Sequence, residues 1–223
     1  MAVAIRNKQH LNHRIEEFTG GQFTGRLKGG TMSLTPSTML DIGTSAPDFS
    51  LEDIEGKTYD LAQRTLSNGL LVIFMCNHCP YVMHIIDKLG EKIRQYQQDG
   101  IEVVAINSND YIQYRDDSPE KMGELARFHN FSFPYLIDED QEIAKAYRAA
   151  CTPDFFLFDE NKKLVYRGRF DAARPGNSEP ITGDELSAAV AQVVAKAAVP
   201  ENQLPSMGCN IKWRKGNAPE YFG

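Results

Sequence analysis

The 223-residue chain has little of several features that would assign a function at once. It has no apolar stretch near the roughly 18 residues that a membrane-spanning helix needs, and its N-terminus lacks the apolar segment of a secretory signal. Its net charge is −6, with acidic and basic residues interspersed, so it offers no basic surface to nucleic acid or to an anionic membrane. We therefore expect a cytoplasmic protein with no nucleic-acid or membrane partner.

Cysteine is also scarce, at four residues. Four are too few for a disulfide scaffold in a chain of this length, and a C-x-x-C pair in a reducing compartment usually serves catalysis or metal binding. Apolar residues, by contrast, make up 42% of the chain, enough for one substantial core. We expect one domain over residues 41–199, with a polar, glycine-rich N-terminal extension (1–40) and a C-terminal tail (200–223).

Two of the cysteines stand between a predicted strand and a predicted helix. Residues 70–75 are a short apolar run typical of a buried strand, and Cys76, Asn77, His78, Cys79 and Pro80 follow directly. Unpaired N–H groups and the dipole at a helix N-terminus favour a thiolate, so we expect Cys76 to be the nucleophile. Cys79, three residues later on the same helical face, would resolve the mixed disulfide. The pair indicates a redox couple.

The rest of the sequence predicts alternating strands and helices. Proline at a first helical position marks two helix starts, at Pro80 and at Pro119 with Ser118 as N-cap, and Gly100 ends the first of these helices. Thr182 and Glu185 have the spacing of a capping box. The predicted order is a β-hairpin (46–61), strand (70–75), helix (80–99), strand (101–106), helix (119–128), short strand (134–137), short helix (141–147), strand (155–158), strand (164–169) and helix (182–198). This order favours an α/β fold, with a mixed sheet and helices on both faces.

The chain resembles the thioredoxin superfamily and, within it, the peroxiredoxin-like AhpC/TSA redoxins. The resemblance covers about residues 41–198. It depends on three segments in the same order, namely residues 43–51 (G-x-x-A-P-D-F-x-L), residues 76–80 (C-N-H-C-P) and Thr152-Pro153 ahead of residues 155–159. It implies a thioredoxin-like fold and a thiol-disulfide oxidoreductase that uses no organic cofactor and acts on protein or small-molecule disulfides or thiols.

The resemblance also implies a docking place for the substrate. Pro153 would be a cis-proline beside the dithiol, and the backbone of Thr152 would be free to pair with an incoming polypeptide. Cis X-Pro bonds are uncommon, and the alternative is that Pro153 begins a strand in trans. The chain departs from thioredoxins at Leu70, which stands where they carry a buried acid, so proton removal from Cys79 would need water or another group.

The peroxidase alternative lacks its usual motif. Peroxiredoxins of this type carry P-x-x-x-T-x-x-C, and counting back from Cys79 places Cys76 at the threonine position, whereas counting back from Cys76 places Ile73 there. The hydroxyl that would bind a peroxide is therefore missing. An antioxidant peroxidase with the same cysteines stays the second hypothesis, and a non-catalytic redoxin-fold binding module the third.

His78 is the residue between the two cysteines that can tune them. An imidazolium next to Cys76 would stabilise its thiolate and hence the reduced form, as in strongly oxidising dithiol proteins with the same residue order. We expect a reduction potential above the roughly −270 mV of thioredoxin. The alternative is that His78 faces the solvent and has little effect on the ionisation of the two cysteines.

The other two cysteines have no motif of their own. Cys151 precedes Pro153 by two residues, so the matched fold would place it near the dithiol as a candidate third redox centre. It could pair with Cys209 from the tail, since the ten-residue link from Val199 reaches up to about 33–36 Å. The alternative is a buried Cys151 and an unreactive Cys209 on a tail that Trp213 anchors by packing.

A zinc site is a further alternative. Four cysteines with His78 or His84 could supply a tetrahedral ligand set, but only one C-x-x-C is present, and the other two cysteines lack the spacing of a zinc knuckle. The sequence therefore favours redox chemistry over metal binding. It does not decide the oligomeric state.

Overall fold

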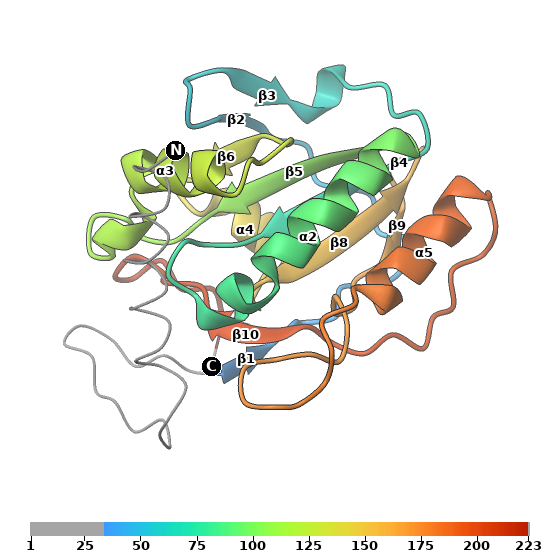
Figure 1. Cartoon of the computed structure of the whole chain (residues 1–223). Coiled ribbons are helices and arrows are strands. Elements are labelled where there is room, and N and C mark those ends of the chain that lie inside the picture. Colours follow the sequence, from blue (N-terminus) through green and yellow to red (C-terminus); the bar gives the residue numbers. More distant parts are fainter. Residues whose placement is uncertain (1–33, 223) are drawn as a thin grey trace, which may run out of the picture. The chain divides into compact units, whose positions relative to one another are not determined.

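A five-stranded mixed sheet lies at the centre of the fold, in the order β6-β5-β4-β8-β9 (Figure 1). The computed structural model describes residues 34–222. Strands β4, β5 and β6 are parallel, β8 is antiparallel to β4, and β9 is antiparallel to β8. The bounds of these strands are Gly69–Phe74 (β4), Ile101–Asn107 (β5), Tyr135–Ile137 (β6), Asp154–Asp159 (β8) and Leu164–Tyr166 (β9). This arrangement confirms the predicted thioredoxin-like α/β fold with a mixed central sheet.

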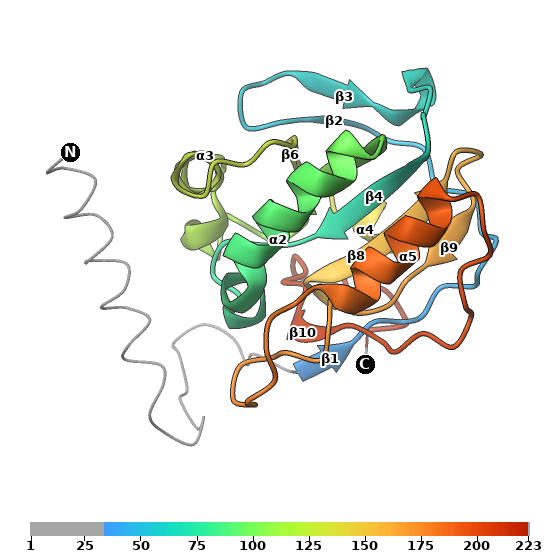
Figure 2. The same cartoon turned by 45° about the vertical axis from the view of Figure 1, so that its right-hand side comes forward.

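The sheet separates two apolar cores. Alternate residues of β4 face opposite sides, so Leu71 and Ile73 pack into one core, and Leu70, Val72 and Phe74 into the other. Helices α2 (Pro80–Gln98) and α5 (Asp184–Val194) cover the first face, and α4 (Glu142–Ala146) packs against the second (Figures 1 and 2). The remaining helical elements are α3 (Pro119–Phe128) and the 3₁₀ turns η1 (Leu61–Gln63) and η2 (Arg115–Asp117). None of the helices between residues 34 and 222 is long and apolar enough to span a membrane.

Several helices and strands form where the local sequence predicted them. The predicted hairpin is formed by β2 (Ser50–Glu52) and β3 (Thr58–Asp60). Helix α2 begins at Pro80 and is followed by Gly100, whose φ of +80° lies in the left-handed region that glycine adopts readily. The Ser118 hydroxyl caps α3 by accepting from the N–H of Lys121 at 3.4 Å.

The predicted capping box at the start of α5 is wrong. The N-cap is Gly183, with a φ of 65°, which has no side chain to accept a hydrogen bond, and the Thr182 hydroxyl accepts from the N–H of Asp184 at 3.3 Å. Instead, the carboxylate of Asp171 accepts from the N–H groups of Thr182 at 2.8 Å and Gly183 at 2.7 Å. Glu185 forms an ion pair with Arg169 at 2.7 Å. Asp171, in the preceding loop, therefore takes the part that Glu185 would have in a capping box, because it accepts from the N–H of the N-cap residue.

The predicted C-terminal tail contributes a strand to the fold. Strand β10 (Met207–Asn210) lies between β1 (Leu34–Pro36) and β7 (Cys151–Thr152) in an antiparallel three-stranded sheet. Trp213 packs against the second core, as expected if this residue anchors the tail by packing. Residues 34–222 belong to one compact unit, and the rest of the predicted N-terminal extension lies outside the described residues.

Candidate dithiol site

Cys76 and Cys79 lie between the carboxyl end of β4 and the first turn of α2. Cys79 is the N-cap of α2, with an extended backbone, and Pro80 occupies the first turn. Both thiols are buried, with exposed fractions of 1% for Cys76 and 0% for Cys79. The strand and the helix thus bring both sulfurs close together, as predicted, but both sulfurs are buried and not exposed to solvent.

Thr152 and Pro153 lie beside the dithiol, and the bond between them is cis, as the resemblance implied. The Cys79 thiol donates to the carbonyl oxygen of Thr152 at 3.0 Å. The sulfur of Cys76 lies 3.5 Å from the Thr152 hydroxyl. One residue therefore contacts both sulfurs, through its backbone and through its side chain.

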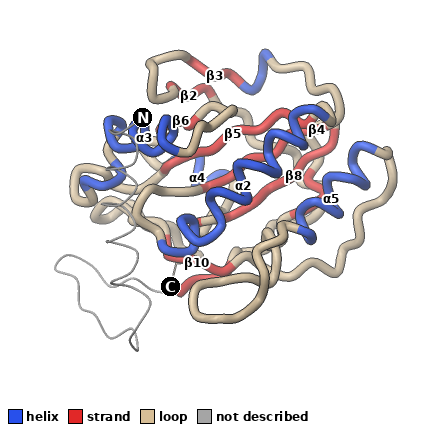
Figure 3. Tube along the Cα trace, in the orientation of Figure 1, coloured by secondary structure: helices blue, strands red, loops and turns tan. Residues whose placement is uncertain are grey.

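The backbone of Thr152 is not free to receive a substrate, which corrects the expectation from the resemblance. Strand β10 pairs with β7 antiparallel, with Cys209 opposite Thr152 and Asn210 opposite Cys151. Strand β10 lies next to the first turn of α2 in all views (Figure 3). The chain's own C-terminal strand thus occupies the edge at which a polypeptide would dock.

The two further cysteines lie on different sides of this small sheet. Cys209 belongs to the same apolar core as Cys76 and Cys79, and it shares a hydrogen bond with Cys79. Cys151 is buried, but its thiol donates to the carbonyl oxygens of Pro153 and Ser206, at 3.6 and 4.0 Å. Because neighbouring residues of a strand point to opposite faces, the register favours a pairing of Cys209 with the dithiol over the predicted pairing with Cys151.

The surroundings of the two thiols shift their pKa values in opposite directions. Burial raises the pKa of Cys76 well above its ordinary value, and a hydrogen bond with Cys79 and the charge of Asp117 raise it further. Burial also acts to raise the pKa of Cys79, but hydrogen bonds from Cys209, Cys76, Thr152 and the N–H of Val82 outweigh it and lower this pKa well below its ordinary value. The helix begins after Cys79, so its N-terminal N–H groups favour a thiolate there and not at Cys76.

His78 is held by a buried carboxylate and does not face the solvent. Its Nδ1 lies 2.7 Å from Oδ2 of Asp117, whose side chain is fully buried, and its ring stacks on Tyr114 with 5.8 Å between the centroids. Burial acts to lower the pKa of His78, but the close carboxylate of Asp117 and its charge, with the charge of Cys79, raise it overall. Because this coupling is mutual, protonated His78 favours a thiolate at Cys79. His78 therefore lies where it can tune the couple.

Residues 42–167, more than half of the chain, match the model of the AhpC/TSA family. The chain belongs to the AhpC/TSA family. The match contains Cys76, Cys79, Cys151 and Pro153, and it ends well before Cys209.

Two solved structures and one curated relative are similar to this chain. A hypothetical protein from Sinorhizobium meliloti 1021 is 46% identical, with a TM-score of 0.80 over 82% of this chain and 100% of that chain. The thiol-disulfide oxidoreductase ResA of Geobacillus thermodenitrificans is 28% identical over 58% of this chain and 70% of its own length. A putative thiol:disulfide interchange protein DsbE from Chlorobium tepidum, at 23% identity, shares the fold with a TM-score of 0.51, over 70% of this chain and 99% of its own.

Two acids of this AhpC/TSA chain, which the sequence did not single out, lie at or near the site. Besides His78, the carboxylate of Asp117 accepts from the Asn77 N–H and from the amide of Asn109, both at 2.8 Å. Asp154 directly follows the cis-proline, is fully buried, and has a pKa that burial raises to about 7. Asp117 is some forty residues from the dithiol in sequence, and no local motif marks either acid.

The structure brings together fewer candidate zinc ligands than the sequence suggested. Among the residues that the structure describes, the atoms of Cys76, His78 and Asp117 lie within 4.8 Å of one another, close enough for a metal ion. Nδ1 of His78 is already held by Asp117. Cys151 directs its thiol to backbone carbonyls. The four-cysteine site considered from the sequence is therefore not the arrangement found.

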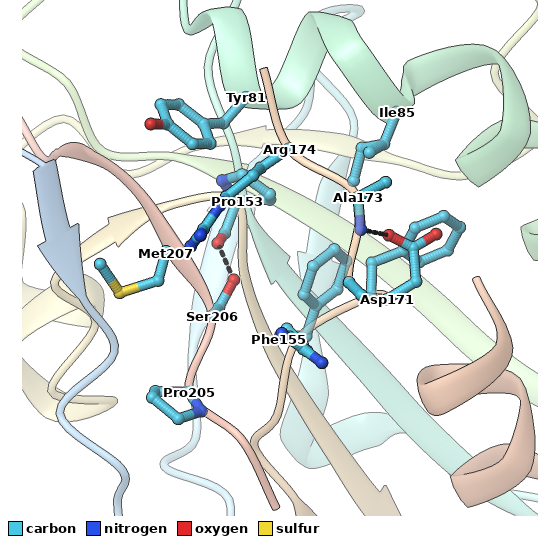
Figure 4. A pocket seen from close by; sticks show the side chains of 13 residues that line it. Tyr81, Ile85, Pro153, Phe155, Asp171, Ala173, Arg174, Pro205, Ser206 and Met207 are labelled. Atoms are coloured by element: carbon cyan, nitrogen blue, oxygen red, sulfur yellow. Dashed lines mark hydrogen bonds between the residues drawn. The ribbon is translucent and has the colours of Figure 1, made fainter. Parts of the chain in front are cut away.

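A small pocket borders the cis-proline (Figure 4). Tyr81 of α2, Pro153, Arg174 and Met207 are among its lining residues, and the Ser206 hydroxyl donates to the carbonyl oxygen of Pro153 at 2.6 Å. Its volume of about 50 Å³ has room for a few water molecules. Because Met207 belongs to β10, this strand forms part of the pocket wall.

Proposed function

We propose that Cys76 and Cys79 are the redox couple of this thiol-disulfide oxidoreductase. In one turnover the substrate disulfide breaks, Cys76 and Cys79 become joined, and two substrate thiols leave with the protons of the two cysteines. The observation that carries this proposal is the contact of both sulfurs with Thr152, next to the cis bond to Pro153. Protein and small-molecule disulfides are the proposed substrates.

The surroundings of the couple support an oxidising potential. A disulfide is easier to reduce when its thiolate form is stabilised, and Cys79 has hydrogen-bond donors and His78 around it that favour the thiolate. We therefore keep the proposal of a reduction potential above about −270 mV. We also propose the cytoplasm as the compartment, because the four cysteines are too sparse for a scaffold of disulfides.

Reduction of insulin by the dithiothreitol-reduced protein tests the function. We expect Cys76→Ser and Cys79→Ser each to lose at least about a hundredfold of the turnover, because a single thiol cannot complete the exchange. Cys151→Ser is the matched control and should retain activity, because the thiol of Cys151 donates to the backbone carbonyls of Pro153 and Ser206 and not to the dithiol. Full turnover in both dithiol variants would contradict the proposal.

Peroxide is a second candidate substrate, because the lowered pKa of Cys79 favours the thiolate that attacks peroxides. The missing threonine hydroxyl argues against it. Stopped-flow mixing of the reduced protein with hydrogen peroxide separates the two functions, since a peroxidase would form sulfenic acid or disulfide far faster than free cysteine does. Stoichiometric zinc on the purified protein, without insulin turnover, would favour a binding module at Cys76, His78 and Asp117 instead.

A further inference from the structure

Strand β10 lies along the edge of β7 at which a substrate polypeptide would dock (the docking edge), and it pairs with a strand on each of its own two sides. It pairs with β1 through Leu34 opposite Cys209, and with β7 through Thr152 opposite the same cysteine. Gly208 permits a very close approach, since a Cβ atom at this position would overlap the carbonyl oxygen of Thr152. The sequence and the ladder thus place Cys209 where a substrate strand would present its own cysteine.

Three sulfurs meet at this point. Cys79 donates to Thr152, directly opposite Cys209, and Cys76 lies against the side chain of the same threonine. Cys76, Cys79 and Cys209 are all nearly fully buried in one apolar core. A side-chain hydrogen bond joins Cys209 and Cys79. Cys209 and Cys79 are therefore the pair of thiols that the ladder and the core place together for an exchange.

We propose that Cys209 is a third redox-active thiol of the site, which exchanges with the Cys76–Cys79 disulfide and becomes joined to Cys79. The sulfur of Cys209 attacks that of Cys79, the bond between Cys79 and Cys76 breaks, and Cys76 leaves with the electron pair and takes up the proton lost by Cys209. The step needs no further oxidant or reductant, because the number of disulfides stays at one. It rests on the proposed function, which supplies the Cys76–Cys79 disulfide.

The charges around Cys209 favour this exchange in the oxidised protein. The hydrogen bond to Cys79 and burial raise the pKa of Cys209, and the charge of a Cys79 thiolate raises it further. Oxidation of Cys79 removes its negative charge, whereas Lys212, whose positive charge lowers the pKa of Cys209, remains. Lys212 is buried and is held by Asn210, to whose two oxygens its ammonium donates at 2.7 and 3.1 Å. Cys209 is therefore a better nucleophile when the couple is oxidised.

The exchange also couples redox state to access. A bond between Cys79 and Cys209 would tie β10 into the docking edge and leave Cys76 as a thiol. Reduction of that bond would free β10 to separate from Thr152. The family match ends at residue 167, so β10 and its cysteine lie outside the part of the chain that defines membership.

Disulfide mapping during a redox titration tests the proposal. Trypsin leaves Cys76 and Cys79 together in residues 65–88, Cys151 in residues 149–162 and Cys209 in residues 197–212. A Cys76–Cys79 bond is therefore internal to one peptide, and a Cys79–Cys209 bond links two. Over the range in which the dithiol is oxidised, we expect the linked pair in the wild type and in Cys151→Ser. Cys209→Ser should show only the internal bond.

Single variants identify the partner of Cys209. Cys76→Ser should form the linked pair on oxidation, and Cys79→Ser should not. An internal bond as the sole product in the wild type at every potential would overturn the proposal and leave the redox couple intact. A link that forms in Cys79→Ser, or one to residues 149–162, would also overturn it. If no bond forms between Cys76 and Cys79 at any potential, even in Cys209→Ser, the proposed function itself fails.

Discussion

At the scale of single residues, Asp117 organises the surroundings of the dithiol. Its buried carboxylate holds His78 at 2.7 Å and the backbone of Asn77 at 2.8 Å, so it fixes the two residues between the cysteines. Its negative charge also raises the pKa of Cys76. This one acid therefore positions the histidine that favours a thiolate at Cys79 and disfavours a second thiolate at Cys76.

Replacing Asp117 should release His78. In Asp117→Asn we expect the pKa of His78 to fall below its ordinary value of about 6.5, because burial then acts without the compensating charge. NMR titration of the imidazole measures this directly. Asp116→Asn is the matched control, since Asp116 is exposed and adjacent. An unchanged titration of His78 in Asp117→Asn would contradict the assigned pairing.

The same pair predicts a pH dependence of stability. The pKa of His78 is higher in the folded chain than in the unfolded chain, so its protonation stabilises the fold. This contribution is fully present below pH of about 6.5 and is lost as the pH rises through the folded-state pKa. Asp117→Asn should therefore cost more free energy of unfolding at pH 5 than at pH 9.

At the scale of elements, the helices and central strands followed local signals, and the exceptions have distant causes. Strand β4 is a continuous apolar run and α2 has proline at its start, so both could be read from neighbouring residues. The start of α5 depends on Asp171, thirteen residues before the helix begins, and was missed. Strand β10 is four residues long, and its partners β1 and β7 are remote in sequence, so no periodicity marked it.

Gly208 offers a test of the closed strand. In Gly208→Ala the added methyl group overlaps the Thr152 carbonyl, so we expect β10 to separate from β7 more often. The native dithiol should then react with iodoacetamide at least about tenfold faster, which corresponds to a loss of about 1.4 kcal/mol in the free energy that holds β10 in place. Gly90→Ala is the control, because a Cβ there meets nothing closer than 3.7 Å. Equal alkylation rates in both variants would count against the closed edge.

At the scale of the whole molecule, the fold and the place of the two dithiol cysteines beside Thr152-Pro153 could be predicted, because both depend on short stretches of contiguous sequence. The C-x-x-C pair, the proline after it and Thr152-Pro153 each stand in short motifs, and the structure brings them together. The order of ionisation and the closed docking edge depend on where α2 begins and on how the C-terminal strand returns to the site. Both are properties of the folded chain and cannot be predicted from the short motifs.

The central claim, that Cys76 and Cys79 can form a two-electron couple without the other two cysteines, is tested most directly in a chain that carries Cys151→Ser and Cys209→Ser. Equilibration with glutathione buffers, acid quenching and mass analysis give the fraction of dithiol at each potential. We predict a single two-electron transition above about −270 mV, with both sulfurs of residues 65–88 joined in the oxidised form. Two sulfurs that remain alkylatable throughout the titration, or that are recovered only as mixed disulfides with glutathione, would contradict the account.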